Sequence, residues 1–397
     1  MDRRFRNSIS LQKNKTKSEI DQNRCGKSNR KPLLCFPLSR QCVNEMNIGT
    51  SLIDLTLLIF AIAILVANYF FTGWFIRYAK VKRMTDYPSE RSSHEVPTPR
   101  GGGVGFVLLT ILSTLIYSVI HGVSNHFGLL IFIAAAMFVA ILGWFDDKND
   151  LSKRVRFTVQ VLSAFMVLLF IQNFNSMYLP GGVQLSLGFT GIILGLIWIT
   201  GSTNIYNFMD GVDGIASVQA LSASAGWIIF AVIWNNSDLL AINLFILSGV
   251  AAFMMFNWSP AKIFMGDVGS LFLGFTFGAM PFLAAYTVES LTIGMAVWIG
   301  GLLLWPFLFD GAFTIFRRLY NGENIFQAHR SHLYQKMNIA GWKHSSVSLI
   351  YLLFSVLSLA VSLLFVYANH ALQGLFLVVL MLFSLLFSVI VLKLQSK

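Results

Sequence analysis

Four polar residues recur at every third position in the stretch 204–214, directly after an apolar run at 187–203. They are Asn204, Asn207, Asp210 and Asp213. On a helix, residues three apart stay on one slowly drifting face, but Gly211 and Gly214 disfavour a regular helix beyond that point. The spacing therefore predicts that two carboxylates and two amides converge where a membrane helix meets water.

Two adjacent carboxylates, Asp146 and Asp147, follow another apolar run at 127–145. At a membrane edge they repel each other unless a cation or a proton neutralises one of them. Mg²⁺ shared with a phosphate-bearing substrate is the usual solution. The pair therefore indicates magnesium and a phosphorylated substrate, and the alternative is a solvated acidic loop.

A further acidic residue, Asp267, stands between Gly266 and Gly269 at the entrance of an apolar run. An Asp on such a tight turn suits a metal ligand, although a helix cap explains the residue equally well when it is considered alone. Phe264, three residues earlier, suits a platform on which a nucleotide base stacks. This segment is a candidate for metal and nucleotide binding.

Two other segments offer groups that could bind anions. His329 and His332 flank Arg330, and together they provide hydrogen-bond donors for phosphate oxygens. They could equally ligate zinc, but no cysteine or third histidine nearby supports that. The three glycines at 101–103 either let backbone amides approach an anion closely or form a flexible helix entry.

A carboxylate also lies inside an apolar run, at Asp310. Charged groups within hydrocarbon are costly, so such a residue is a functional candidate by default. Pairing with Arg317 or Arg318 is the structural alternative.

The composition places these residues in a membrane protein. Of the 397 residues, 55% are hydrophobic and 12% are charged, which excludes an ordinary soluble domain. From residue 52 onward the chain consists of apolar runs near the ~20 residues needed to span hydrocarbon, two of which Pro281 and Pro306 are expected to kink. We predict an all-α, polytopic integral membrane protein with about eleven transmembrane helices, at 52–76, 102–120, 127–145, 155–172, 187–206, 214–234, 239–257, 269–288, 292–316, 346–368 and 371–392.

Basic residues set the orientation of these spans. Of the 29 Lys and Arg residues, 11 precede position 51, and the other 18 all fall on one side of the predicted spans. By the positive-inside rule that side is cytoplasmic. Every polar cluster described above, Asp310 apart, lies in these loops or at their membrane edge, so the sequence predicts catalytic loops on the cytoplasmic face.

Residues 1–45 are polar, basic and aperiodic, which predicts a disordered tail. Residues 1–50 hold 11 basic and 4 acidic residues, and eleven spans would place them outside, against the positive-inside bias. We therefore expect Met46 to be the natural initiator, and a chain that starts at Met46 to insert and keep full activity. Residues 46–397 are predicted to form one transmembrane domain.

In their order along the chain, these segments resemble the polyprenyl-phosphate N-acetylhexosamine-1-phosphate transferases, in particular the undecaprenyl-phosphate branch that initiates O-antigen-like glycans. The resemblance covers about residues 50–345 and rests on Ser93-His94, Arg100 to Gly102, Asp146-Asp147, Asn204 to Gly214, Phe264 to Ser270 and His329 to His332. It implies transfer of an N-acetylhexosamine 1-phosphate from a UDP-sugar to undecaprenyl phosphate, with release of UMP, at the bacterial inner membrane. Because both substrates are anionic, Mg²⁺, or Mn²⁺ in its place, is the expected cofactor.

The resemblance also implies roles for single residues. Asp146 would be the base toward the lipid phosphate, and Asp267 would bind Mg²⁺ together with Asp147 and Asn207. The implied substrate contacts are Asn207, Asp210 and Asp213 at the nucleotide and metal, Phe264 on uracil, Arg156 near phosphates, and His329, Arg330 and His332 on the sugar or diphosphate. Direct attack and a covalent aspartyl intermediate are both compatible with this set.

Two alternatives stay open. A phospho-N-acetylmuramoyl-pentapeptide transferase has the same fold, but its last motif holds three histidines where this chain has His329-Arg330-Ser331-His332. A secondary transporter or flippase explains many spans but not polar segments confined to one face, and no inverted repeat is evident. The main body carries little net charge, so no nucleic-acid partner is expected, and a homodimer in the lipid membrane is compatible with the sequence.

Overall fold

The computed structural model describes residues 55–86, 96–179, 182–324 and 330–395. All of them belong to one unit, Leu52–Lys397. Several predictions concern residues outside the described ranges, namely the tail 1–45, Met46, Ser93, His94 and His329.

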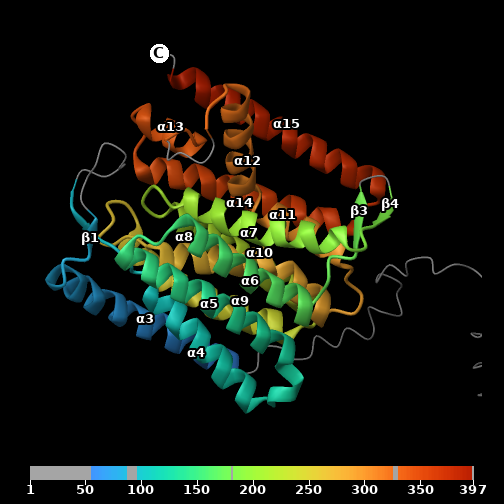
Figure 1. Cartoon of the computed structure of the whole chain (residues 1–397), viewed down its shortest axis with the longest axis horizontal. Coiled ribbons are helices and arrows are strands. Elements are labelled where there is room, and N and C mark those ends of the chain that lie inside the picture. The colour runs from blue at the N-terminus through green and yellow to red at the C-terminus, as the bar shows by residue number, and fades with distance from the viewer. Residues whose placement is uncertain (1–54, 87–95, 180–181, 325–329, 396–397) are drawn as a thin grey trace, which may run out of the picture. The chain divides into compact units, whose positions relative to one another are not determined.

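Most of the described residues lie in α-helices, which confirms the predicted all-α class (Figure 1). The helices are α3 (Leu55–Val81), α4 (Val104–Ile120), α5 (Phe127–Asn149), α6 (Lys153–Phe170), α7 (Thr190–Met209), α8 (Ile215–Ile233), α9 (Ser237–Asn257), α10 (Asp267–Thr287), α11 (Ile293–Leu303), α12 (Trp305–Tyr320), α13 (Leu333–Ile339), α14 (His344–Tyr367) and α15 (His370–Gln395), with a 3₁₀ turn, η1 (Val123–His126). Two short antiparallel pairs complete the described elements, β1 (Thr85–Asp86) with β2 (Thr98–Pro99) and β3 (Ser176–Leu179) with β4 (Val183–Ser186).

Each predicted apolar run corresponds to one helix or to the pair α11 and α12. Within the described ranges, eight helices are long and apolar enough to cross a membrane, or nine if the bent pair counts as one span. The two predicted spans outside this set are α4, which has 17 residues, and α6, whose first turn carries Lys153, Arg154 and Arg156. A multi-pass membrane fold is therefore confirmed, and the count of eleven stays a prediction.

Helix α10 lies in the middle of the bundle and contacts α5, α7 and α11 (Figure 1). Of its most apolar window, 94% is buried, whereas 22% of the corresponding windows of α3 and α15 is buried. Exposed apolar side chains on the outer helices suit contact with hydrocarbon, where backbone polar groups must be satisfied within each helix. The central position of α10 places its first residue, Asp267, among the ends of its neighbours.

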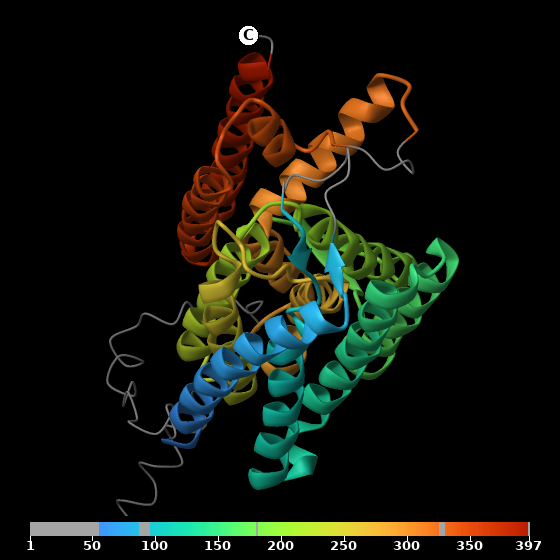
Figure 2. The same cartoon turned by 90° about the vertical axis from the view of Figure 1, so that its left-hand side faces the viewer.

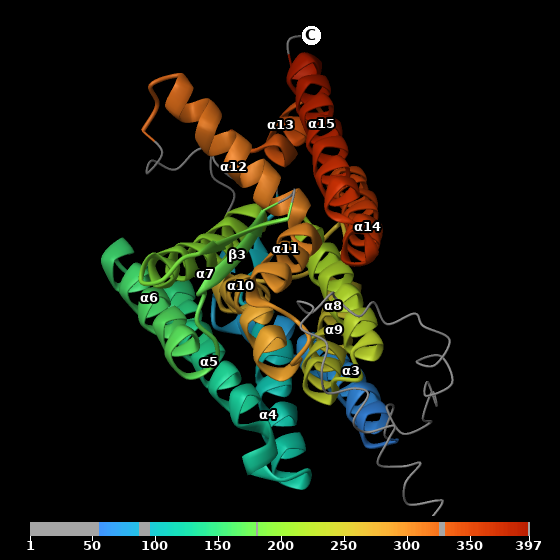
Figure 3. The same ribbon diagram turned by 90° about the vertical axis from the view of Figure 1, so that its right-hand side faces the viewer.

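The predicted span 292–316 is broken, because α11 and α12 meet at an angle of 83°. Pro306 lies in the first turn of α12, where a missing N–H costs nothing. Figures 2 and 3 show α12 leaving the bundle at an angle to α14 and α15. Pro281, by contrast, lies inside α10, and that helix continues through it.

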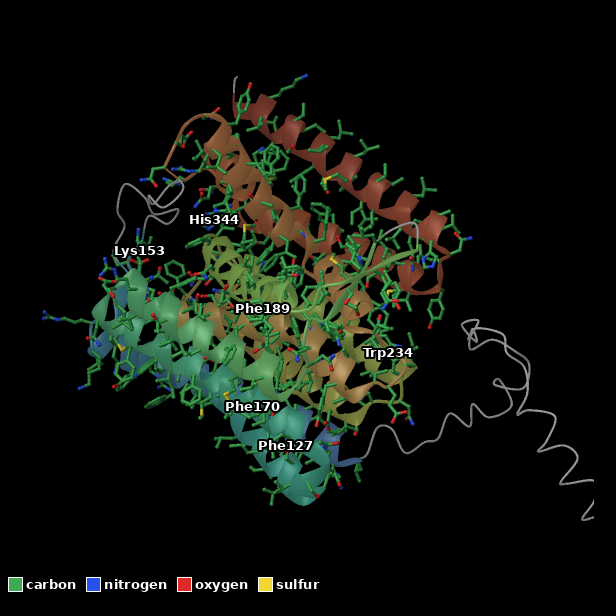
Figure 4. All side chains as sticks on the ribbon, turned by 45° about the vertical axis from the view of Figure 1, so that its right-hand side comes forward. Phe127, Lys153, Phe170, Phe189, Trp234 and His344 are labelled. Atoms are coloured by element: carbon green, nitrogen blue, oxygen red, sulfur yellow. The ribbon has the colours of Figure 1, made fainter. Side chains whose placement is uncertain are left out.

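The polar segments gather at one end of the helices. Figure 4 shows Lys153 and His344 toward that end, and Phe127 and Trp234 toward the other. Close helix approach there depends on glycine, because a Cβ on Gly143 of α5 would lie 2.5 Å from the carbonyl oxygen of Asp267. The start of α10 can therefore lie directly against the end of α5.

Candidate functional site

Asp147, in the last turn of α5, fixes the start of α10. Its Oδ1 accepts a hydrogen bond from the backbone amide of Asp267 at 2.9 Å, and its Oδ2 accepts one from Val268 at 3.1 Å. Nε of Arg100 lies 2.8 Å from the same carboxylate. A carboxylate at a helix N-terminus satisfies free amides and interacts favourably with the helix dipole. Asp147 therefore positions Asp267 through the backbone.

Asp146 is almost fully buried, at 1% exposed, and its carboxyl comes within hydrogen-bonding reach of that of Asp267. Its Oδ1 accepts from the Leu151 amide at 2.8 Å. Its Oδ2 lies 2.9 Å from Nε of Arg156, but that N–H donates to the Leu151 carbonyl, and Oδ2 accepts no hydrogen bond from the described residues. Two carboxylates in such contact require a proton or a cation between them.

Asn207, near the end of α7, orients Asp267 from another side. Its Nδ2 donates to Oδ1 of Asp267 at 2.9 Å and to the hydroxyl of Ser270 at 2.8 Å. Asn204, one turn earlier, instead donates to Oε1 of Gln160 at 2.6 Å. The structure therefore brings Asn207 to the carboxylates, whereas Asn204 joins α7 to α6.

Asp210 follows the last residue of α7 and lies in the field of the same carboxylates. Burial, together with the negative charges of Asp267, Asp147 and Asp213, raises the pKa of Asp210 to about 7. The sequence-based prediction that Asp210 lies near the other acidic residues agrees with this placement. A positive charge at this end of the helices would relieve the repulsion among these carboxyl groups.

Asp213, three residues further, faces a different set of groups. Its Oδ1 lies 3.2 Å from Nδ1 of His344, and its Oδ2 accepts from the Ala261 amide at 3.2 Å. Its carbonyl accepts from the Ser348 hydroxyl at 2.6 Å. Burial works to raise the pKa of Asp213, but the hydrogen bond and charge of His344 outweigh burial, so the pKa is lowered. Asp213 is therefore ionised and anchored to α14.

Phe264 lies in the loop that enters α10, with a half-buried side chain. This loop runs beside the three glycines: the amides of Gly102 and Gly103 donate to the carbonyls of Phe264 and Met265, at 2.9 and 2.8 Å. These two amides are engaged and cannot cradle an anion in this arrangement. A Cβ on Gly103 would lie 2.5 Å from Cα of Gly269, so this glycine permits close packing.

Asp310, in α12, anchors the start of α13. Its Oδ1 accepts from the amide of Leu333 at 2.9 Å and lies 3.2 Å from Nδ1 of His332. Its Oδ2 accepts from the amide of Tyr334 at 3.2 Å and from the hydroxyl of Tyr351 at 2.6 Å. The buried carboxylate is thus surrounded by donors, and it holds His332 in a fixed orientation.

The alternative partners considered for Asp310, Arg317 and Arg318, form no ion pair with it among the described residues. Arg317 donates to the carbonyl of Ser331, and Arg318 lies 3.0 Å from the carboxylate of Glu323. The sequence missed the true partners because they come from α13 and α14.

Tyr334 connects this segment to the end of α7. Its hydroxyl donates to the carbonyl of Phe208 at 2.9 Å. A Cβ on Gly211 would lie 2.0 Å from that hydroxyl, so the approach requires glycine there. Arg330, half-buried, and His332 therefore lie on a segment that packs against the loop of Asp210. His329 lies outside the described residues.

Three residues of α14 were not predicted from the sequence: His344, Ser348 and Tyr351. Each of them contacts a carboxylate or carbonyl of a polar motif. Their spacing of four and three residues within an apolar run is the signal that could have identified them, because it places polar groups on one buried face.

The facing pair Asp146 and Asp267 fits a magnesium ion. Within the described ranges no group of three or more His, Cys, Asp or Glu residues is arranged to hold a metal by itself. Mg²⁺, however, is usually bound by one or two carboxylates plus substrate phosphates. Oδ2 of Asp146, which accepts no hydrogen bond from the described residues although Arg156 lies beside it, agrees with such an ion. Asp147 fits less well, because both of its oxygens bind the α10 amides.

Known proteins resemble this chain over most of its membrane region. Residues 129–285 match the family described as glycosyl transferase family 4. A Bacillus subtilis (strain 168) protein, named probable undecaprenyl-phosphate N-acetylglucosaminyl 1-phosphate transferase, is 30% identical over 279 residues, which are 69% of this chain and 75% of that protein. The phospho-N-acetylmuramoyl-pentapeptide-transferase of Streptococcus pneumoniae serotype 19F (strain G54) is 31% identical over 186 residues, 45% of this chain and 56% of that protein. The chain belongs to the polyprenyl-phosphate hexosamine-1-phosphate transferase family, as its motifs predict.

Proposed function

We propose that this protein transfers an N-acetylhexosamine 1-phosphate from a UDP-sugar to undecaprenyl phosphate and releases UMP. The observation that carries the proposal is the facing pair Asp146 and Asp267, with Arg156 and Arg100 beside it. Two anionic substrates can meet only where cations offset their charge. The name of the B. subtilis relative, which matches over most of both chains, favours this donor class.

Asp267 would hold Mg²⁺, or Mn²⁺ in its place, while Asn207 orients its carboxylate and Asp147 fixes its backbone. When bound, the ion supplies positive charge that stabilises the developing negative charge on the donor diphosphate. This division of roles revises the implied ligand set, because Asp147 acts through the helix amides.

The lipid phosphate oxygen would attack the β-phosphorus of the UDP-sugar. A bond forms between these two atoms, and the bond from that phosphorus to the bridging oxygen of UMP breaks. Asp146 would take the proton of a lipid phosphate that arrives protonated, since its Oδ2 accepts no hydrogen bond from the described residues. Arg156, 2.9 Å away, stabilises the ionised form of this base and approaches the lipid phosphate.

The donor would lie between the loop after α7 and the start of α13. In this arrangement Phe264 stacks on uracil, and His329, Arg330 and His332 bind the sugar or the diphosphate. Asp210 lines the nucleotide side. Asp213 contributes by holding the loop, because its carboxylate binds His344 and the Ala261 amide.

We place the site at the cytoplasmic face of the bacterial inner membrane, and the product at the start of a lipid-linked, O-antigen-like cell-envelope glycan. The confinement of basic residues to one side of the predicted spans supports this sidedness. A lipid acceptor and a soluble donor require a site at the membrane edge, and the ends of α5, α7 and α10 provide one.

A second candidate donor is UDP-N-acetylmuramoyl-pentapeptide. The streptococcal relatives carry that activity in their names. Their match covers 45% of this chain, and the segment His329-Arg330-Ser331-His332 departs from the three-histidine motif of that branch. We therefore favour the simpler UDP-N-acetylhexosamine.

The test is an assay of the purified full chain in lipid nanodiscs with undecaprenyl phosphate, Mg²⁺ and a panel of UDP-N-acetylhexosamines plus UDP-N-acetylmuramoyl-pentapeptide. We expect UMP release with one or more of the simple donors, and a lipid product whose mass equals undecaprenyl diphosphate plus that sugar less one water. Activity with the pentapeptide donor alone would select the second candidate. Failure to release UMP with any donor would contradict both.

A further inference from the structure

Helix α14 carries a polar face that no sequence motif predicts. His344, Ser348, Tyr351 and Ser355 follow each other at intervals of four, three and four residues, which places them on one side of a helix. Ser348, Tyr351 and Ser355 are at most 1% exposed. Buried polar groups in a membrane helix are costly unless they are hydrogen-bonded. Their partners therefore indicate what this face does.

The first partner is the loop after α7. The backbone N–H of Asp213 donates to Nδ1 of His344 at 3.4 Å, and the same Nδ1 lies 3.2 Å from Oδ1 of Asp213, to which it donates when it carries a proton. The Ser348 hydroxyl binds the Asp213 carbonyl at 2.6 Å. Both the side chain and the backbone of Asp213 are thereby fixed, three residues from Asp210.

The second partner is the start of α13. The Tyr351 hydroxyl donates to Asp310 at 2.6 Å, and the same carboxylate accepts from the amides of Leu333 and Tyr334. Tyr334 in turn binds the carbonyl of Phe208, in α7. One face of α14 therefore touches both segments that we assign to the donor.

The last residue of this polar face, Ser355, is fixed to the bundle. The Ser355 hydroxyl donates to Oε1 of Gln219 at 2.9 Å, and Nε2 of Gln219 donates to the carbonyl of Leu303, the last residue of α11, at 2.8 Å. The helix is thus anchored beside the break between α11 and α12. A rigid helix that contacts two loops can set the distance between them.

We propose that His344 and Tyr351 are positioning residues for the nucleotide-sugar donor, and that α14 holds the loop of Asp210 and the segment of Arg330 at the separation this donor requires. The proposal rests on the proposed function. It concerns the donor and not the lipid, because the lipid-phosphate groups, Asp146 and Arg156, belong to α5 and α6, whereas α14 packs on α8, α11, α12, α13 and α15.

The test compares kinetic constants for both substrates in single variants. Tyr351→Phe and His344→Gln should each raise the donor KM about tenfold, the effect of losing one hydrogen bond to a charged group, with the lipid KM within about twofold of wild type. His344→Asn should keep the donor KM close to the wild-type value, because the Asn amide nitrogen takes the place of Nδ1. The Gln amide nitrogen takes the place of Nε2 instead, so His344→Gln should not.

Two matched controls come from the same helix. Ser358 is buried, and its hydroxyl has no hydrogen-bond partner among the described residues, so Ser358→Ala should leave both KM values unchanged. Tyr367, at the far end of α14, is 46% exposed, so Tyr367→Phe should also be neutral. Equal effects on donor and lipid, or equal loss in His344→Asn and His344→Gln, would overturn the assignment.

A second readout is independent of catalysis. Hydrogen–deuterium exchange without substrate should speed up in residues 210–216 for His344→Gln and in residues 330–336 for Tyr351→Phe, and should stay at the wild-type rate in both controls. Unchanged exchange in both segments would refute the positioning role. If the wild type releases no UMP but exchange responds as expected, the proposed function is wrong, while the role of α14 in holding the two segments is supported.

Discussion

Two pairs of carboxylates in this protein differ in the hydrogen-bond donors that surround them. Asp213 and Asp310 are surrounded by donors: imidazole and amide for the first, imidazole, two amides and a tyrosine hydroxyl for the second. Asp146 and Asp267 instead face each other. Each accepts one hydrogen bond from the described residues, from the Leu151 amide and from Asn207 respectively, and Oδ2 of Asp146 accepts none. The chain thus contains saturated and unsaturated carboxylates at the same end of its helices.

This difference distinguishes carboxylates with a structural role from carboxylates with a role in the reaction. A buried carboxylate that accepts several hydrogen bonds is stabilised in its charged form and fixes the backbone around it. Two carboxylates that face each other are unfavourable without a cation or a proton, and such arrangements persist where function requires them. The comparison predicts opposite consequences when each type is neutralised.

The largest effect is expected for the unsaturated pair. Asp267→Asn and Asp146→Asn should each lower UMP release at saturating Mg²⁺ by at least about a hundredfold, because a metal ligand or a base is lost. Thermal stability in EDTA should be equal to or above that of wild type, since repulsion is relieved. Near-normal turnover in either variant would remove that residue from the site.

The saturated carboxylate Asp310 should behave in the opposite way. Asp310→Asn loses charge-assisted bonds from Tyr351 and the α13 amides, so unfolding should become easier by about 1.5–3 kcal/mol. Turnover should fall by about tenfold, less than for Asp267→Asn, because the reacting groups remain. Thermal unfolding in detergent and the UMP assay measure the two effects. A variant as stable as wild type would contradict the structural role.

A substitution of Arg330 distinguishes binding of the donor from binding of the lipid. Arg330→Ala should raise the donor KM about fivefold to tenfold and leave the lipid KM unchanged, because a cation that pairs with the diphosphate or sugar is removed. Lys343→Ala serves as a control for the loss of one exposed positive charge near the same end. An equal rise in both KM values, or a rise for the lipid alone, would exclude the donor assignment.

The smallest effect concerns pH. The pKa of Asp210 is about 7 in the folded protein against an ordinary value of 3.8. The folded state therefore binds more protons than the unfolded state between these values, and the stability that this group contributes is lost as the pH rises from about 4 through 7. In EDTA, Asp210→Asn should flatten the fall in melting temperature across this window. An identical pH dependence in both proteins would argue against the raised pKa.

Much of the fold could be predicted because hydropathy and charge act over single segments. Each apolar run became a helix or the pair α11 and α12, and Pro306 marked the place where that pair is bent. The short helix α13 was not predicted, because its seven residues depend on hydrogen bonds that its first amides donate to Asp310 and on a cap at His332. Tertiary partners decide such short elements, and sequence periodicity does not reveal them.

The acidic residues of the site could be predicted from the sequence, but the residues that hold them in place could not. Of the two amides expected among the carboxylates, Asn207 lies beside Asp267, whereas Asn204, one turn earlier in α7, binds Gln160. The period of three does not extend to Asp213, because α7 ends at Met209 and the Asp213 carboxylate lies against His344 and the Ala261 amide. The partner of Asp213, His344, follows 131 residues later, a distance over which no local pattern acts.

Metal binding tests the difference between the two carboxylate pairs most directly. Mn²⁺ titration followed by electron paramagnetic resonance, with UMP present, should show one bound ion in the wild type and in Asp310→Asn. Asp267→Asn should lose this ion, and Asp146→Asn should bind it at least about tenfold more weakly, because a facing carboxylate has been neutralised. Undiminished Mn²⁺ binding in Asp267→Asn, or its loss in Asp310→Asn alone, would contradict the assignment of the unsaturated pair to the cation.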